Sequence, residues 1–237
     1  FALWDGHRQT LFCARDHLGV RPFYYHSSPT FFACASEIKA LLALPGVPQR
    51  ANDVRLADFL LLLESAGKDE TAYAEIWRLP PGHRLEVSPA GLTIRRYWAL
   101  DPEPTLLLGS DAAYAEAFRE VFAEAVRCRL RTTHAVGSIL SGGLDSACVT
   151  VMARELWQRP TPLHTFSAVF TGAGDTDERP FIDDILAGGG LLGHRMDGND
   201  LQLSADEVGL IARQVEEPIW YAFQLVLWRL YGLARTQ

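Results

Sequence analysis

The most informative stretch of this sequence is Val136-Gly137-Ser138-Ile139-Leu140-Ser141-Gly142-Gly143-Leu144-Asp145-Ser146. Its first part belongs to an apolar strand predicted for residues 135–140, and a helix is predicted from Asp145 to about Gln158. Between them, two glycines without Cβ atoms let the backbone bend so that its N–H groups converge on an anion. The positive end of the helix dipole points to the same place. The stretch therefore predicts a loop between a strand and a helix that binds phosphate oxygens.

Six loop residues form the predicted phosphate site: Ser141, Gly142, Gly143, Leu144, Asp145 and Ser146. The two serines add hydroxyl donors, and Asp145 either caps the helix or holds a magnesium ion beside the phosphates. The loop lacks the lysine and the spacing of a Walker loop, which argues against release of a nucleotide's terminal phosphate. The alternative is a glycine-rich turn that binds no ligand.

The second half of the chain, residues 111–237, alternates between predicted helices and strands. Helices are predicted for 111–130 and 145–158, and strands for 135–140 and 163–170. Strands that alternate with helices of ten or more residues pair in parallel through crossover connections. This half is therefore predicted to be α/β, with a doubly wound parallel sheet. Three more helices are predicted, for 178–187, 204–215 and 222–234, and Gly188-Gly189-Gly190 follows the first of them.

The first half, residues 1–98, has the pattern of strands with short helices. The strands are predicted for 1–4, 10–14, 21–26, 30–35, 82–87 and 92–98, and the helices for 37–42 and 53–65. The dipeptide Asp5-Gly6 makes a hairpin of the first two strands, and Ser36 is the predicted N-cap of the first helix. This half is predicted to be α+β. Asp101-Pro102-Glu103-Pro104 interrupts both patterns and marks a linker over 99–110.

Composition excludes several classes of protein. Hydrophobic residues make up 48% of the 237 and charged residues 22%, which is typical of a globular protein. The net charge of -7 argues against a nucleic-acid partner, which needs a dense basic surface. No apolar run reaches the ~18 residues of a membrane span. The irregular spacing of the four cysteines predicts no zinc site, but reduced and mostly buried thiols in a cytosolic protein.

Both ends of the chain look interrupted. It opens on strand-like Phe1 without a methionine and stops just after a helical run. We therefore expect a piece of a longer protein.

Several segments together resemble one family. The Ser141–Ser146 loop, with the strand before it, resembles the pyrophosphate loop of the ATP pyrophosphatase domains in the asparagine synthetase family. Segments 15–25, 35–42 and 79–83 resemble parts of the glutaminase domain of that family, in the same order. The resemblance implies a class II glutamine amidotransferase domain of the N-terminal-nucleophile type over 1–98. An ATP-binding domain like the adenine nucleotide alpha hydrolases is implied over 111–237.

The resemblance also implies a reaction. In this family the β-carboxylate of aspartate attacks the α-phosphorus of ATP, which releases pyrophosphate, and ammonia from glutamine then displaces AMP from the aspartyl adenylate. ATP and Mg²⁺ are the implied cofactors, with Asp145 as a magnesium ligand, and ATP, aspartate and glutamine the implied substrates. Ile139 and Ala168 are placed near the nucleotide base and ribose. A cytoplasmic location and a possible homodimer, without nucleic-acid or membrane partners, complete these expectations.

Departures from the family pattern limit what the resemblance implies. The glutaminase nucleophile is an N-terminal cysteine, which Phe1 does not provide, and Cys13 and Cys34 have no terminal amine. No catalytic residue is therefore identifiable. Val169 and Gly188–Gly190 also depart from the pattern, so a related amide ligase of the macrolactam or β-lactam type stays open. An inactive nucleotide-binding module is the third alternative.

Two pairs of charged residues are assigned structural roles. Arg15 and Asp16, at the end of a predicted strand, are expected to form an ion pair or a turn. Glu216 and Glu217 are expected to lie at a solvated helix end in preference to touching substrate. His134 and His164, beside predicted strands, are expected to be structural.

Overall fold

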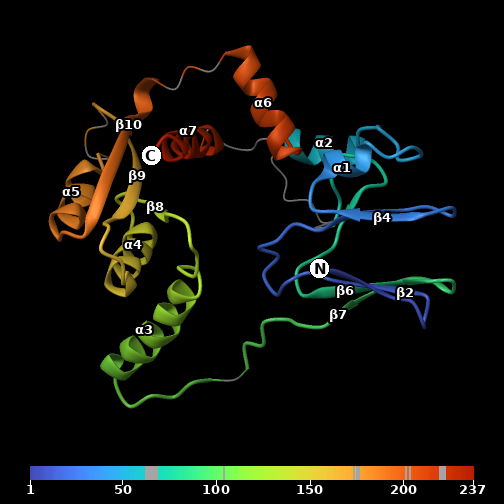
Figure 1. Ribbon diagram of the computed structural model, residues 1–237, viewed down its shortest axis with the longest axis horizontal. Coiled ribbons are helices and arrows are strands. Elements are labelled where there is room, and N and C mark those ends of the chain that lie inside the picture. The colour runs from blue at the N-terminus through green and yellow to red at the C-terminus, as the bar shows by residue number, and fades with distance from the viewer. Residues whose placement is uncertain are drawn as a thin grey trace. The chain divides into compact units, whose positions relative to one another are not determined.

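The computed structural model describes residues 1–61, 69–103, 105–172, 174, 177–200, 202, 204–218 and 223–237. The chain folds into two compact units (Figure 1). The first unit comprises residues 1–105 together with 209–220, and the second comprises 106–208 and 221–237. Each unit has its own sheets and its own apolar core.

The first unit contains two antiparallel sheets. One has the order β1-β2-β6-β7 and the other β4-β3-β5. The strands are β1 (Ala2–Asp5), β2 (Thr10–Ala14), β3 (Tyr24–Ser27), β4 (Phe32–Ala35), β5 (Trp77–Arg78), β6 (His83–Ser88) and β7 (Gly91–Arg96). Both predicted hairpins are confirmed, since Asp5 pairs with Thr10 and Ser88 pairs with Gly91. The sequence does not predict the two-residue strand β5.

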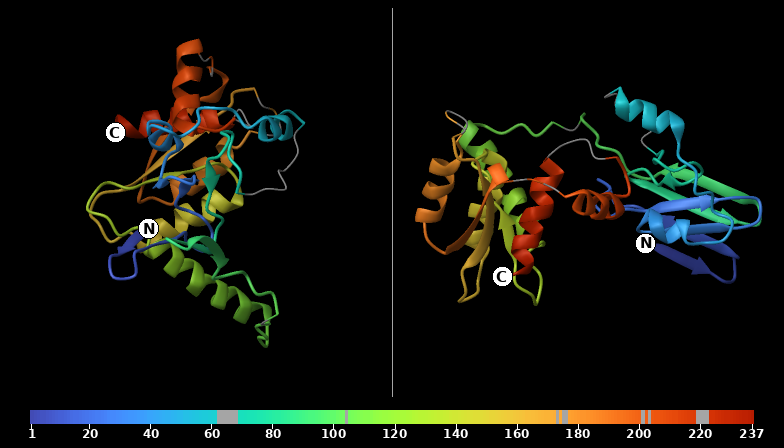
Figure 2. Two further views of the ribbon diagram at one scale, coloured as in Figure 1. Left: turned by 90° about the vertical axis from the view of Figure 1, so that its right-hand side faces the viewer. Right: turned by 90° about the horizontal axis from the view of Figure 1, so that it is seen from above.

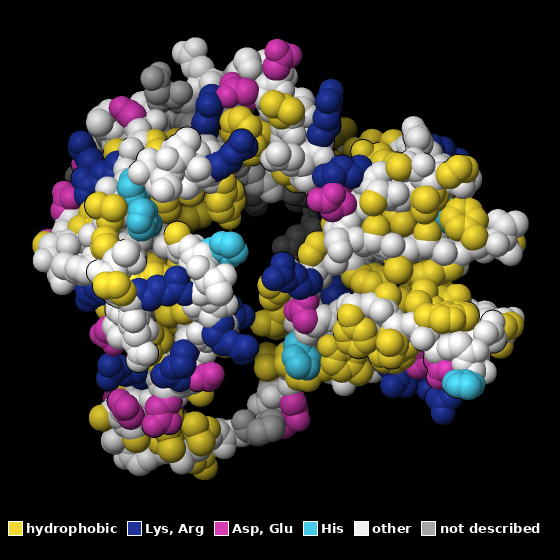
Figure 3. Space-filling view, in the orientation of Figure 1, with side chains coloured by type: hydrophobic (Ala, Val, Ile, Leu, Met, Phe, Trp, Pro, Cys, Tyr) yellow, Lys and Arg dark blue, Asp and Glu magenta, His cyan; other side chains and the backbone are white. Residues whose placement is uncertain are grey.

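Alternate side chains of the strands divide the apolar core of the first unit into two layers. Cys13 and Leu85 from one sheet pack with Tyr25 from the other, which places a core between the sheets. Side chains on the other face of the second sheet pack against the helix α1 (Ile38–Leu42), whose Ile38 and Leu41 are fully buried. The predicted α+β arrangement of sheets with peripheral helices is confirmed for this unit. In Figure 3 hydrophobic side chains gather over its strands.

The start of α1 differs from the prediction. The helix begins at Ile38, and the residue at its N-cap position, Glu37, makes no side-chain cap. Ser36 is therefore not the cap, and that prediction is wrong. The amides of Ile38 and Lys39 instead donate to the carboxylate of Glu216, from far along the chain.

The second helix of the first unit, α2, covers Asp53–Leu60. Its cap is local, because the side chain of Asn52 accepts a hydrogen bond from the amide of Arg55. The sequence predicts a helix as far as Ser65. The structure ends it at Leu60, and residues 62–65 lie outside the described part of the chain.

The second unit is built on a parallel sheet of order β10-β9-β8. Its strands are β8 (Gly137–Ile139), β9 (Leu163–Val169) and β10 (Leu191–Asp197). Its helices are α3 (Asp111–Arg127), α4 (Leu144–Leu156), α5 (Arg179–Ala187) and α7 (Phe223–Arg235), with a short 3-10 helix at Gly198–Asp200. The helix α6 (Ala205–Val215) begins in this unit and belongs to the first unit from Gly209 onward.

Helices cover both faces of the parallel sheet. Leu163 packs with Val126 of α3 and Met152 of α4, whereas Phe166, on the opposite face, packs with Val226 and Leu230 of α7. Figure 2 shows α5 and α7 on opposite sides of the strands. The parallel pairing and the cover on both faces agree with the predicted doubly wound α/β pattern.

The strand β10 is missing from the sequence prediction. Its sequence, Leu191-Leu192-Gly193-His194-Arg195-Met196-Asp197, has no β-branched residue and no alternation of apolar and polar positions. It pairs with β9 along its whole length, and Gly193 lets Leu186 of α5 approach, because a Cβ there would lie 2.7 Å from that side chain. Gly189 and Gly190, both with positive φ, turn the chain from α5 into this strand.

All four cysteines are free thiols, as the sequence predicts, but the prediction that most of them are buried is only partly correct. Cys13 is buried and Cys34 half-buried, whereas Cys128 and Cys148 are exposed. The expectation of mostly buried thiols is therefore wrong for two of the four. Among the described residues, none of the helices combines the length and the apolar character that crossing a bilayer requires.

Candidate functional site

The predicted phosphate loop lies on the surface of the second unit, at the carboxyl end of β8. The amide of Leu140 still donates to the carbonyl of Phe166 in β9, and the helical bond from the amide of Ala147 to Gly143 begins α4. Gly142 and Ser146 are half-buried, and the other four residues of 141–146 are exposed. The loop is thus at the edge of a parallel sheet where ligands of α/β proteins bind, and most of it is exposed.

The two serine hydroxyls hold the loop in shape. Ser146 Oγ accepts from the amide of Ser141 at 3.0 Å and lies 2.8 Å from Ser141 Oγ. It also lies 3.1 Å from the carbonyl oxygen of Gly143, and Ser141 Oγ accepts from the amide of Gly143 at 3.3 Å. The hydroxyls predicted to donate to phosphate are therefore engaged with the loop itself.

The amide of Gly142 is bound by a carboxylate from another element. It donates to Oε2 of Glu178, the residue before α5, at 3.3 Å. The two residues are in close contact, since a Cβ on Gly142 would lie 2.6 Å from Glu178 Cβ and 3.0 Å from its carbonyl oxygen. Only glycine fits here without displacing the start of α5.

Sequence reasoning does not identify Glu178 as a site residue. A signal for it exists, because Glu178 comes after the strand next to β8 and directly before a helix whose first turn contains Pro180. The loops that follow neighbouring parallel strands meet at one edge of the sheet. An acidic residue at that point could have been placed beside the phosphate loop.

Asp145 occupies the first turn of α4 and is exposed. The helix starts at Leu144 with Gly143 as its N-cap, and no side chain caps it. Of the two roles considered for Asp145, capping is therefore wrong, and magnesium binding stays a prediction. No group of three or more His, Cys, Asp or Glu side chains suited to a metal occurs in the described part of the chain. Mg²⁺ in such a loop would depend on one carboxylate together with phosphate oxygens, as magnesium often does.

Ile139 and Ala168, predicted to lie near the base and ribose, come together on one face of the sheet. Both pack against the cluster of Phe166, Val226 and Leu230 beneath α7. Their contact with a nucleotide stays a prediction.

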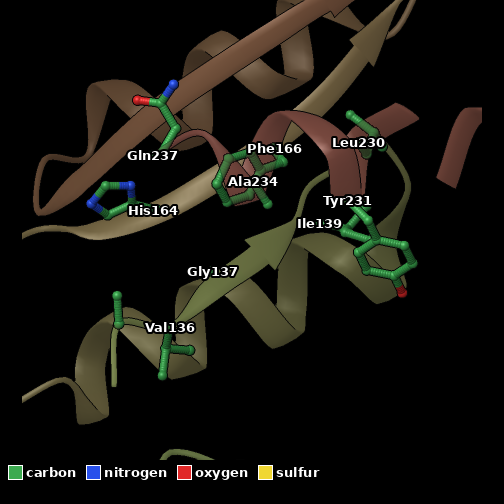
Figure 4. A pocket seen from close by; sticks show the side chains of 10 residues that line it. Val136, Gly137, Ile139, His164, Phe166, Leu230, Tyr231, Ala234 and Gln237 are labelled. Carbon is green, nitrogen blue, oxygen red and sulfur yellow. The ribbon is translucent and has the colours of Figure 1, made fainter. Parts of the chain in front are cut away.

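A cavity of about 260 Å³ lies between the strands β8 and β9 and the helix α7 (Figure 4). Its walls are mostly apolar, and Gly137, Ile139 and Phe166 form the sheet side while Leu230 and Tyr231 come from α7. His164 lies at one end, 3.1 Å from Nε2 of His194 through its Nδ1. The rings of the two histidines also stack, which agrees with the structural role expected for His164.

In the first unit, Arg15 and Asp16 form a turn. The guanidinium of Arg15 donates to the carbonyl oxygens of Gly19, Arg21 and Leu79. The carboxylate of Asp16 accepts from the amides of Val20 and Arg21, and these backbone bonds, that of Arg21 first, lower the pKa of Asp16. The predicted structural role of the pair is confirmed.

Comparison with known proteins gives the family. Residues 1–98 match a glutamine amidotransferase domain, and residues 117–237 match the asparagine synthase family. Asparagine synthetase [glutamine-hydrolyzing] 3 of Bacillus subtilis is 32% identical over 206 residues, which is 82% of this chain and 33% of that protein. Putative asparagine synthetase [glutamine-hydrolyzing] 2 of Methanocaldococcus jannaschii is 31% identical over 77% of this chain and 35% of its own length.

A third relative has a different name. Amidase chry2 of Gibberella zeae is 31% identical over 99% of this chain and 35% of its own length. The chain thus spans about a third of the length of the curated relatives it matches. Since the asparagine synthase match alone covers half of the chain and an amidotransferase match precedes it, the chain belongs to the asparagine synthetase family.

Proposed function

We propose that the protein makes asparagine in a glutamine-dependent reaction. ATP adenylates the side-chain carboxylate of aspartate, and ammonia from glutamine replaces AMP, so that the products are asparagine, AMP and pyrophosphate. In this proposal the second unit holds the phosphates of ATP, and the first unit is part of the domain that supplies ammonia.

The observation that carries the proposal is the bond between the amide of Gly142 and the carboxylate of Glu178. Because this amide already binds an anionic carboxylate oxygen, the bond supports the idea that a phosphate oxygen can bind at the same place. The N-terminal end of α4 lies beside it, and a backbone amide with a helix dipole stabilises negative charge without any reorganisation. These are the properties needed to hold pyrophosphate as it leaves the α-phosphorus.

The other loop residues have supporting roles in the proposal. Ser141 and Ser146 fix the loop so that its amides need not reorder when ATP binds. Asp145 would hold Mg²⁺ against the phosphates, and the metal would neutralise the developing charge on them. Ile139 and Ala168 would border the nucleotide from the sheet.

A second candidate is amide chemistry on another acceptor. It is favoured by relatives that carry the name amidase, chry2 of Gibberella zeae and chyE of Penicillium rubens, each aligned over 99% of this chain. A carboxylate other than that of aspartate would then be adenylated at the same loop.

The experiment is to measure pyrophosphate release by the whole protein, and not by these 237 residues alone, with Mg-ATP, with and without aspartate, and with glutamine or ammonium as nitrogen donor. Release that depends on aspartate, together with asparagine as a product, is the expected result. Release with other carboxylates but not with aspartate would favour the second candidate. Binding of Mg-ATP without any pyrophosphate release would leave only a nucleotide-binding module and would refute both.

A further inference from the structure

Two adjacent carboxylates, those of Glu216 and Glu217, are largely buried in the first unit. Their side chains are 8% and 15% exposed. Both are expected from the sequence at a solvated helix end, and that expectation is wrong. Glu216 and Glu217 follow α6 directly and belong to residues 209–220, which fold with the first unit although the sequence on both sides of them belongs to the second.

Glu216 binds the backbone at the start of α1 with both oxygens. Oε2 accepts from the amide of Ile38 at 2.7 Å and Oε1 from the amide of Lys39 at 2.8 Å. The ammonium group of Lys39 lies 3.6 Å from Oε1. Since α1 has no side-chain cap of its own, these bonds satisfy amides that no neighbouring residue in the sequence serves.

Glu217 binds a different part of the same unit. Its Oε1 lies 2.7 Å from Nη2 of Arg78, and its Oε2 accepts from the amide of Ala72 at 3.2 Å. The side chain of Arg78 is itself only 22% exposed and stands over the ring of Tyr24, 5.6 Å from its centroid. Removing one partner of a charged pair this little exposed costs more stability than removing one partner of an exposed pair.

The backbone between the two carboxylates is strained. Glu216 has a φ of 62°, a conformation that side-chain-bearing residues rarely adopt, and its amide donates to the carbonyl of Ala212 near the end of α6. Such a conformation persists where the surroundings over-determine it. Here the two carboxylates hold the backbone in this conformation, because each of them is bound by two backbone or side-chain donors of the first unit.

From these contacts we infer that the first unit has a docking surface for two adjacent carboxylates, and that Glu216 and Glu217 anchor residues 209–220 to it. The surface consists of the amides of Ile38, Lys39 and Ala72 and the guanidinium of Arg78. Because the asparagine synthase match extends over 117–237, the anchor fastens a segment of the synthase region into the amidotransferase-like unit. The folding of α1 therefore depends on a residue 178 positions away from Ile38 in the sequence.

The test is backbone hydrogen exchange, resolved to single amides, on the whole chain. Glu216→Gln replaces one accepting oxygen by an NH₂ group that faces an amide donor, so the amides of Ile38 and Lys39 should exchange at least about tenfold faster. Arg78→Gln should loosen the other side of the contact, and residues 209–215 should lose protection from exchange although they are far from Arg78 in the sequence. Glu37→Gln is the matched control, since it removes a charge beside α1 from a side chain that caps no amide.

Unchanged protection of Ile38 and Lys39 in Glu216→Gln would overturn the inference, as would equal loss in Glu37→Gln. If residues 209–215 keep their protection from exchange in Arg78→Gln, Glu216 acts only as a cap of α1. That result would also overturn the inference. If Glu216→Gln does not fold, Glu216→Asp keeps the charge but retracts the carboxylate by one methylene group. That variant should expose the same two amides with the rest of the first unit intact.

Discussion

The carboxylate of Glu178 accepts a hydrogen bond from the amide of Gly142 at a distance of 3.3 Å. An acidic side chain therefore lies against the backbone group that we propose binds pyrophosphate. Two negative groups cannot share one amide without repulsion, so phosphate must displace this carboxylate or bind beside it with a cation between them. The relationship makes Glu178 a determinant of how tightly the loop binds anions.

Neutralising Glu178 should strengthen anion binding. Glu178→Gln removes a charge that is worth about 1 kcal/mol in a solvated ion contact, so the Kd for pyrophosphate should fall by about fivefold. Titration calorimetry with magnesium pyrophosphate measures it. Asp184→Asn, which removes a charge from an exposed position on α5, is the control and should leave Kd unchanged. Weaker binding by Glu178→Gln would show that the carboxylate helps to hold the cation instead.

A methyl group at Gly142 should damage the loop where one at Gly143 does not. The Cβ of Gly142→Ala would lie 2.6 Å from Glu178 Cβ, whereas that of Gly143→Ala would meet only Ser141 Oγ, at 3.4 Å. We expect Gly142→Ala to cost about 1–3 kcal/mol in the free energy of unfolding, as overpacking does, and to abolish pyrophosphate binding. Urea unfolding and calorimetry give both values. Equal stability of the two variants would contradict the close contact with Glu178.

The elements of this fold are predictable from sequence where local signals agree. The hairpins of the first unit have turn residues between apolar runs, and the strand before Ser141 leads into a helix through two glycines. Both features are specified by neighbours in the sequence, so both are predicted correctly. The strand β10 carries no such signal, since its pairing with β9 supplies what its own residues lack.

The candidate site is predictable to the same extent. The loop residues share one segment and are identified together, but Glu178 reaches the loop only because two parallel strands end side by side. Glu216 is the clearest case. Its role as the cap of α1 depends on contacts across 178 residues of sequence, whereas the local pattern points to Ser36. Periodicity and capping rules describe neighbours, and such contacts depend on the folded chain.

The thiols of Cys13 and Cys34 should react differently. They pack in the core between the two sheets. A hydrogen bond from the Cys13 thiol lowers the pKa of Cys34 to about 7, and the same bond, with burial, raises the pKa of Cys13. Alkylation of Cys34 by iodoacetamide, followed by peptide mass spectrometry, should therefore be half-maximal near pH 7. Cys13→Ala should move that midpoint upward, and an unchanged midpoint would show that the hydrogen bond does not control it.

The anchor should also respond to pH through Glu217. Burial raises the pKa of Glu217 above its ordinary value of 4.5, and the attraction of Arg78 only partly offsets this effect. The folded state then binds more protons than the unfolded state between the two pKa values, so this residue's contribution to stability falls as pH rises through that window. Lowering the pH from neutrality toward 4.5 should therefore stabilise the wild-type chain relative to Glu217→Gln, which does not titrate. Urea unfolding of both proteins across this range measures the difference, with Glu86→Gln, at a more exposed ion pair of the first unit, as the control. If the wild-type chain instead loses stability relative to Glu217→Gln as the pH falls, the attraction of Arg78 outweighs the effect of burial on the pKa of Glu217. The charge of Glu217 would then stabilise the anchor.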